Sequence, residues 1–164
     1  MLNHHMKKYG YIPLWVLIRI MTLGEVSKFY ELMKQKDQNA VAKKFGVREK
    51  TLKTYLHNIA IVRNICAHDE KLYDLKLNNA ITKNNIHFNY NLDLQDRKYS
   101  NGYKDLFSII IILKALLKET EFEKFYTILL DDLEELKQNI NSIDFIQILN
   151  KMGFPKEYKK LLDL

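Results

Sequence analysis

Three side chains able to act on a phosphodiester lie within six positions of one another, at Arg63, Asn64 and His68. Arginine offers a planar fork of N–H donors that matches a phosphate group. Histidine gives and takes protons near neutral pH, and asparagine can orient either partner. A phosphate clamp with a general acid or base suffices to cleave RNA through its own 2′-hydroxyl, so these three are candidate catalytic residues that require no metal ligands and no cofactor.

Helical geometry decides which of these side chains can meet. Residues advance by about 100° each on an ideal helix, so Asn64 and His68 share a face with His57 and Ile61, whereas Arg63 points about 140° away from His68. One interpretation is therefore a surface histidine near a helix C-terminus, with the arginine paired to a carboxylate. The alternative is a site made by two copies of the helix across a two-fold axis, where each arginine approaches the other chain's histidine.

The element that carries these residues is predicted to be a long helix over residues 48–67. Its apolar positions recur with the 3.6-residue period of an amphipathic helix. The predicted core stripe consists of Leu52, Tyr55, Leu56, Ile59, Val62 and Cys66. Cys66 is accordingly expected to be a small buried apolar residue, not a nucleophile.

The rest of the chain predicts further helices and one irregular insertion over residues 69–101. The predicted helices cover about residues 13–21, 25–33, 38–45, 103–117, 121–136 and 142–152, with a terminal turn at 156–162. The first and the 103–117 helices are apolar nearly all round and should be buried. Gly24 should mark a break, while Asp37 and Ser142 should be N-caps. The alternation of Ile86, Phe88 and Tyr90 fits a short strand or an extended loop. We therefore expect a single all-α domain spanning residues 1–164.

Composition narrows the class of protein. The chain has 164 residues with a formal net charge of +6 at pH 7 and a pI near 9.2, which is compatible with a polyanionic partner. A single cysteine rules out an intramolecular disulfide and any cysteine cluster for zinc, and it fits a reducing cytosol. No apolar run approaches the roughly 20 residues of a membrane span. We expect a cytoplasmic protein that does not bind membranes.

A family resemblance adds to these expectations. The string RNICAH at residues 63–68 resembles the R-N-x-x-x-H form of the HEPN motif, and more narrowly the R-N-x-C-A-H motif of the Abi-like abortive-infection family of bacterial phage-resistance proteins. The KLYD string at residues 71–74 continues this pattern, with Lys71 where arginine is common. The strings PLW at 13–15, TLGEVSKFY at 22–30 and MGFP at 152–155 are also similar to the family. Its members are usually longer, and this chain resembles their C-terminal half.

The resemblance implies a HEPN-like helical bundle, often a homodimer, and a metal-independent endoribonuclease of the phage-defence or toxin type that leaves a 2′,3′-cyclic phosphate. Arg63 would then stabilise the charge on the phosphate, His68 would act as acid or base, and Asn64 would orient the site. Lys71, Tyr73 and His57 are further candidates for contact with the RNA. An antitoxin or another regulatory partner would accompany a toxin.

Two other functions stay open at this stage. The segment from Ala40 to Leu56 has the short-helix, glycine, long-helix pattern of a helix-turn-helix, which would make the protein a DNA binder. The same motif residues could also belong to a catalytically silent RNA-binding or interaction module.

Overall fold

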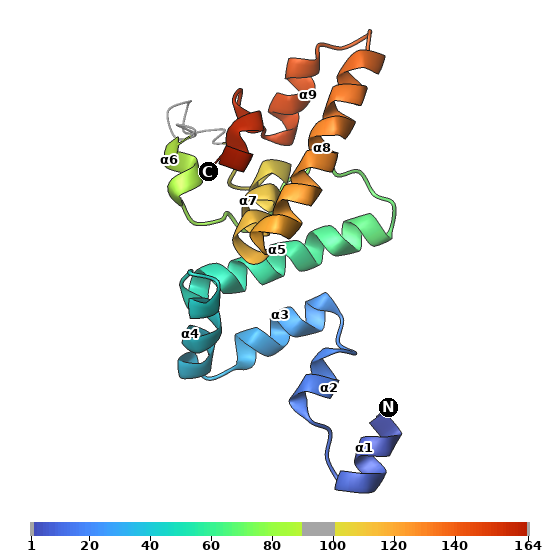
Figure 1. Cartoon of the computed structure of the whole chain (residues 1–164), viewed down its shortest axis with the longest axis vertical. Helices are drawn as coiled ribbons and strands as arrows, with labels where there is room; N and C mark the ends of the chain where they lie inside the picture. The colour runs from blue at the N-terminus through green and yellow to red at the C-terminus, as the bar shows by residue number, and fades with distance from the viewer. Residues whose placement is uncertain (1, 90–100, 164) are drawn as a thin grey trace.

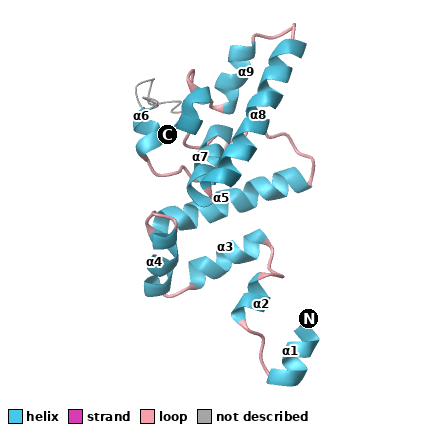
Figure 2. Cartoon of the chain, viewed as in Figure 1, coloured by secondary structure: helices cyan, strands magenta, loops and turns pink. Residues whose placement is uncertain are grey.

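The computed structural model describes residues 2–89 and 101–163, and within these residues every regular element is helical. The elements are α1 (Leu2–Tyr9), α2 (Leu14–Ile18), α3 (Leu23–Leu32), α4 (Gln35–Lys44), α5 (Glu49–Ala67), α6 (Asn85–Asn89), α7 (Leu106–Leu116), α8 (Glu119–Asn139), α9 (Phe145–Met152) and the 3₁₀ helix η1 (Tyr158–Asp163). The all-α prediction is confirmed (Figures 1 and 2).

Helix α7 lies at the centre of the main core. Phe107 and the run Ile109–Ile112 are at most 4% exposed, as expected for a helix that is apolar on all sides. Helices α5 and α8 pack against it, and η1 packs against α8. A smaller core of Tyr30, Ala42 and Leu52 joins α3, α4 and α5. Helix α5 belongs to both cores and therefore runs through the middle of the molecule, with α3 and α4 on one side (Figure 1).

Two backbone hydrogen bonds join the insertion to the residues just before α7. The Leu77 amide donates to the Lys104 carbonyl at 2.7 Å, and the Ile81 amide donates to the Tyr103 carbonyl at 3.0 Å. Both apolar side chains are buried, so the insertion contributes to the core despite its irregular backbone. The prediction of a short strand or an extended loop at Ile86 and Phe88 is wrong, because residues 85–89 form α6. This helix begins after Asn84, whose side chain accepts from the Ile86 amide. Tyr90, the third residue of that alternation, lies outside the described residues.

The prediction of a buried first helix is also wrong. Helix α2 has only five residues, and of these Val16 alone is buried while Trp15 is 60% exposed. A one-turn helix that no second layer covers cannot bury an apolar surface on all sides. The break falls at Thr22, two residues before the predicted Gly24, because Thr22 and Glu25 form a capping box that starts α3.

Two predicted N-caps are displaced in the structure. Helix α4 begins earlier than expected, after Lys34, which places Asp37 inside the first turn, where a carboxylate is favourable near the helix N-terminus. Helix α9 is capped by Asp144, whose side chain accepts from the Ile146 amide at 3.0 Å, and not by Ser142. Both residue types cap well, so the sequence allowed either start for α9.

Candidate functional site

Helix α5 ends at the motif in a well-defined backbone structure. His68 is the C-cap, and the next residue, Asp69, adopts the left-handed conformation with φ of 53°. The Glu70 amide donates to the Ile65 carbonyl at 3.1 Å and the Asp69 amide donates to the Cys66 carbonyl at 3.4 Å, the pattern of a Schellman motif. Aspartate tolerates this conformation better than most residues but less well than glycine. The motif histidine is therefore held at a fixed helix end.

Arg63 and Asn64 lie one turn earlier, and both are exposed. The Nη1 of Arg63 donates to the Oδ1 of Asn64 at 3.2 Å. No carboxylate in the described part of the chain pairs with Arg63, so the predicted ion pair of the surface interpretation is absent there. The regular helix keeps Arg63 and His68 about 140° apart. One chain by itself thus brings Asn64 close to either residue but does not bring the arginine and histidine together.

The prediction that Cys66 is buried is wrong, because its side chain is exposed. The core stripe holds for the first turns of the helix, where Leu52 and Tyr55 are 1% and 2% exposed. The last turns extend past α7, as Figure 1 shows for the C-terminal end of α5. A residue can continue the apolar period and still meet solvent where the neighbouring helix has ended, and this accounts for Cys66.

A polar face runs along α5 to the motif. Lys50, His57, Asn64 and His68 fall within about 40° of one another on an ideal helix. His57 is half-buried and the other three are exposed. Helix α3 packs near Lys53, as the ion pair of that lysine with Glu31 shows, and α7 packs on the Tyr55 side. The face between them is exposed at Lys50 and at Asn64 and His68, and it is partly covered at His57.

The segment after the motif places two candidate RNA-contacting residues at the surface. Lys71 is exposed, and the Tyr73 side chain is 44% exposed. The Nζ of Lys151, near the end of α9, lies 5.7 Å from the centre of the Tyr73 ring, within cation–π range. Lys151 is thus a further cation beside the motif segment. Sequence inspection missed it because only the tertiary fold brings α9 to this segment.

A buried polar cluster lies where the insertion meets the start of α7. The His87 side chain is fully buried: its Nε2 lies 2.9 Å from the Gly102 carbonyl and its Nδ1 lies 2.8 Å from Asn84 Oδ1. The Gly102 amide in turn donates to Asp105 Oδ2 at 2.7 Å, and the Ser108 amide donates to Asp105 Oδ1 at 3.0 Å. These bonds connect the insertion to the start of α7.

The burial of this cluster changes its titration. Burial raises the pKa of Asp105 to about 6, although hydrogen bonds from Gly102 and Ser108 oppose the rise. Burial lowers the pKa of His87, against the hydrogen bond to the Gly102 carbonyl. Asn58, also fully buried, donates from Nδ2 to the Asn79 carbonyl at 3.0 Å and so ties α5 to the insertion. These groups are enclosed, so their role is to hold the insertion in place.

Neither a metal site nor a membrane span is found in residues 2–89 and 101–163. No three His, Cys, Asp or Glu side chains there are grouped so that they could hold a metal ion. None of the described helices combines the length and hydrophobicity needed to cross a membrane.

Comparison with known families confirms the resemblance for the first part of the chain. Residues 1–74 match the family model of the Abi-like proteins. The match includes the whole motif at residues 63–68, together with Lys71 and Tyr73, and it ends at residue 74, within the first part of the insertion. The MGFP string at 152–155 lies outside it. No curated protein and no solved structure matches the chain. Residues 1–74 are therefore similar to the Abi-like proteins.

Proposed function

We propose that this protein is a metal-independent endoribonuclease of phage defence or of the toxin type, whose active site is shared between two copies of the chain. The observation that carries the proposal is the state of Arg63, Asn64 and His68. All three are exposed at the projecting end of α5, and no carboxylate in the described structure neutralises the arginine. Side chains that only stabilised the fold would be expected to have partners within it.

The chemistry follows from the residue types. A general base removes the proton of a ribose 2′-hydroxyl, the 2′-oxygen attacks the adjacent phosphorus, and the 5′-oxygen leaves with a proton from a general acid. The products are a 2′,3′-cyclic phosphate and a free 5′-hydroxyl. His68 is the residue that can act as base or acid, and Arg63 stabilises the negative charge that builds up on the phosphate in the transition state. Asn64, which accepts from Arg63, orients the guanidinium.

The two-copy arrangement answers the geometric difficulty within one chain. The projecting end of α5 is free to lie against the same end of a second copy. Across a two-fold axis, the arginine of one copy faces the histidine of the other, and the operation makes two equal sites.

The test is RNA cleavage in EDTA by the purified protein, with His68→Ala and Arg63→Ala as site variants and Arg19→Ala as the matched control. Arg19 is an exposed arginine at the end of α2, outside the motif. We expect cyclic-phosphate products from the wild type and Arg19→Ala, and a loss of at least about 100-fold in both site variants, as is typical when an acid–base group is removed.

The opposite outcomes separate the alternatives. Equal cleavage by all four proteins would indicate a contaminating nuclease and would refute the assignment of these residues. Binding of RNA without any cleavage would support the catalytically silent module. Sequence-specific binding to duplex DNA would support the helix-turn-helix alternative. For that alternative, the structure shows α4 and α5 in contact, with Thr51 and Leu52 buried inside the would-be recognition helix.

A further inference from the structure

The positive charge of the chain is concentrated at the end of α5 opposite to the motif. Residues 34–53 contain seven lysines and arginines and only two carboxylates, Asp37 and Glu49, so these 20 of 164 residues account for +5 of the net +6. The segment comprises α4 and the first turns of α5. The remaining residues are close to neutral overall, which makes this a local feature and not a property of the whole surface.

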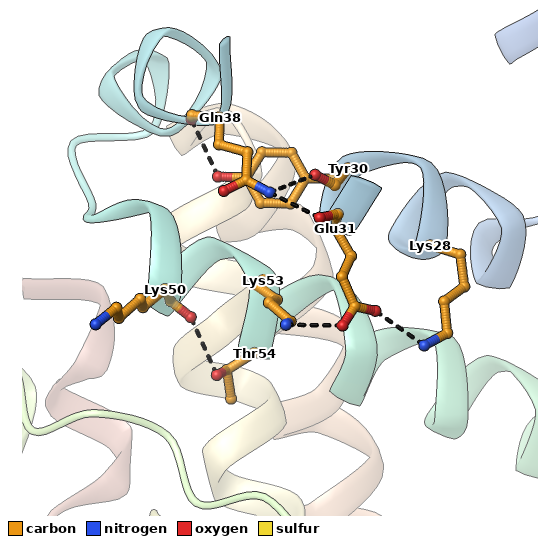
Figure 3. Close-up of polar contacts among 7 residues, drawn as sticks. All are labelled: Lys28, Tyr30, Glu31, Gln38, Lys50, Lys53 and Thr54. Atoms are coloured by element: carbon orange, nitrogen blue, oxygen red, sulfur yellow. Dashed lines mark hydrogen bonds and ion pairs between the residues drawn. The ribbon is translucent and has the colours of Figure 1, made fainter. Parts of the chain in front are cut away.

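Most of these cations have no partner in the fold. We define the α4 basic surface by six exposed residues outside any ion pair in the described structure: Lys34, Lys36, Lys43, Lys44, Arg48 and Lys50. The seventh cation, Lys53, bonds to Glu31 at 2.7 Å. Figure 3 shows Lys53 turned toward Glu31 and Lys50 pointing away from it. Six unpaired like charges repel one another, so folding alone gives no reason to gather them.

The scaffold beneath the α4 basic surface is rigid. The hydroxyl of Tyr30 donates to the carbonyls of Gln38 and Glu49 at 3.0 and 3.3 Å, which joins α3 to both α4 and α5. The Gln38 side-chain amide donates back to the Tyr30 and Glu31 carbonyls, both at 2.9 Å (Figure 3). Ala42, 1% exposed, packs in the small core on the same side of α4. The charged side chains therefore project from a fixed helix.

The arrangement on α4 points the charges outward. Lys36 and Lys43 are seven residues apart and lie about 20° from each other on an ideal helix. They occupy the side opposite Gln38 and Ala42, which face the fold. An extended polyanion lying along α4 can therefore meet both lysines at once.

The α4 basic surface is connected to the motif by the polar face of α5. Lys50 belongs to both, and His57 and Asn64 continue the face to His68. Helix α5 has 19 residues and is thus about 28 Å long. Successive phosphates of one strand in a nucleic acid helix advance by about 3.4 Å along the helix axis, so a strand with this rise needs about eight nucleotides to reach from end to end of α5.

We propose that the α4 basic surface holds the phosphate backbone of an RNA that runs along α5, so that the scissile phosphate reaches Arg63 and His68 only when the RNA extends about eight nucleotides to one side. The inference rests on the proposed ribonuclease function and adds a substrate class to it: long RNA, held by its backbone. Five of the six cations are lysines, which bind phosphate as point charges without reading bases. Length, not sequence, is what this surface selects.

The experiment compares two triple variants with the same change in charge. The α4 variant carries Lys36→Gln, Lys43→Gln and Lys44→Gln. The matched control carries Lys7→Gln, Lys124→Gln and Lys156→Gln, three exposed lysines without ion pairs in the described structure, spread over α1, α8 and the segment before η1. Binding of a 30-nucleotide single-stranded RNA is measured from 0.1 to 1 M salt in the His68→Ala background.

We expect the α4 variant to bind the 30-mer about 100-fold more weakly at 0.1 M salt, with a slope of log K against log salt that is shallower by about 2, because each lost single-strand phosphate contact contributes about 0.7. The control should change neither quantity appreciably. With the motif intact, the kcat/KM advantage of the 30-mer over a tetranucleotide should shrink by a similar factor in the α4 variant.

The outcomes that overturn the inference are distinct from those that overturn the ribonuclease. An unchanged salt slope in the α4 variant, or an equal loss in the control, would refute docking at this surface. A larger loss of binding to duplex DNA or to anionic lipid vesicles than to RNA would assign the surface to that partner instead. Wild-type protein that binds the 30-mer through α4 and cleaves no RNA would leave the docking inference standing and refute only the catalytic proposal.

Discussion

Mixing two inactive variants tests the shared active site directly. Arg63→Ala lacks the phosphate clamp, and His68→Ala lacks the acid or base. Each variant alone should be inactive. If the arginine of one copy works with the histidine of the other, a mixed dimer contains one site with both residues missing and one site with both present. Activity should then reappear on mixing, although neither variant chain carries both residues.

The size of the recovery follows from the arrangement. In an equal mixture that exchanges freely, half of the dimers are mixed, and each mixed dimer has one intact site of two, so the expected activity is about a quarter of wild type. The geometry that requires this result is the 140° between Arg63 and His68 on a straight helix. A site formed within one chain gives no intact site in any dimer, and its expected recovery is zero.

The assay is single-turnover cleavage of a fluorescent 30-mer in EDTA, after incubation of the two variants for increasing times. Subunit exchange is followed independently by mass spectrometry of intact dimers, with one variant isotopically labelled. The control mixes His68→Ala with the Arg63→Ala/His68→Ala double variant, which cannot restore a site in either arrangement. Complete exchange without recovery would refute the shared site, as would a wild type that is active as a monomer.

Two further predictions concern the cluster that holds the insertion. Gly153→Ala should destabilise the fold by about 3 kcal/mol in urea titrations, because φ is +82° and the new Cβ would overlap the Asp105 carboxylate that caps α7. The matched control is Gly46→Ala, with φ of +66° and open space at its Cβ, which should cost only about 1 kcal/mol. Equal losses of stability in the two variants would contradict the clash. Asp105 has a folded pKa near 6, above its ordinary 3.8, so its contribution to stability is present below about pH 4 and lost as pH rises to about 6. The loss of folding stability should be on the order of 3 kcal/mol relative to Asp105→Asn. Buried His87, with its lowered pKa, has the opposite effect on stability as pH falls below 6.5. Parallel profiles of stability against pH for wild type and Asp105→Asn would refute the raised pKa of Asp105.

Local signals predicted the elements whose causes are local. Helix α5 begins and ends within a residue of its predicted bounds, because Gly46 and the apolar period from Leu52 mark it in the sequence. The all-apolar run of α7 likewise predicted its own burial. The position of the candidate residues on α5 follows from the same period, including the divergence of Arg63 and His68.

The exposure of single side chains could not be predicted from the sequence where it depends on where a neighbouring helix ends. Cys66 continues the apolar period but is exposed because α5 extends past α7, and Trp15 is exposed because α2 has no covering layer. Lys151 and Tyr73 are distant in sequence and meet only through the packing of α9. These are tertiary facts, and no local pattern encodes them.

The two ends of α5 are also where the chain departs from what helix stability favours. At the start, Arg48 is an N-cap that makes no side-chain capping bond, and Lys50 places a second cation where the helix dipole favours anions. At the other end, Asp69 takes a left-handed conformation that glycine would adopt at less cost. A sequence selected only for folding would be expected to remove such conflicts, and proteins tend to keep them at functional sites. Both conflicts fall on one helix, at the proposed docking surface and at the proposed catalytic motif, which agrees with an RNA path along α5.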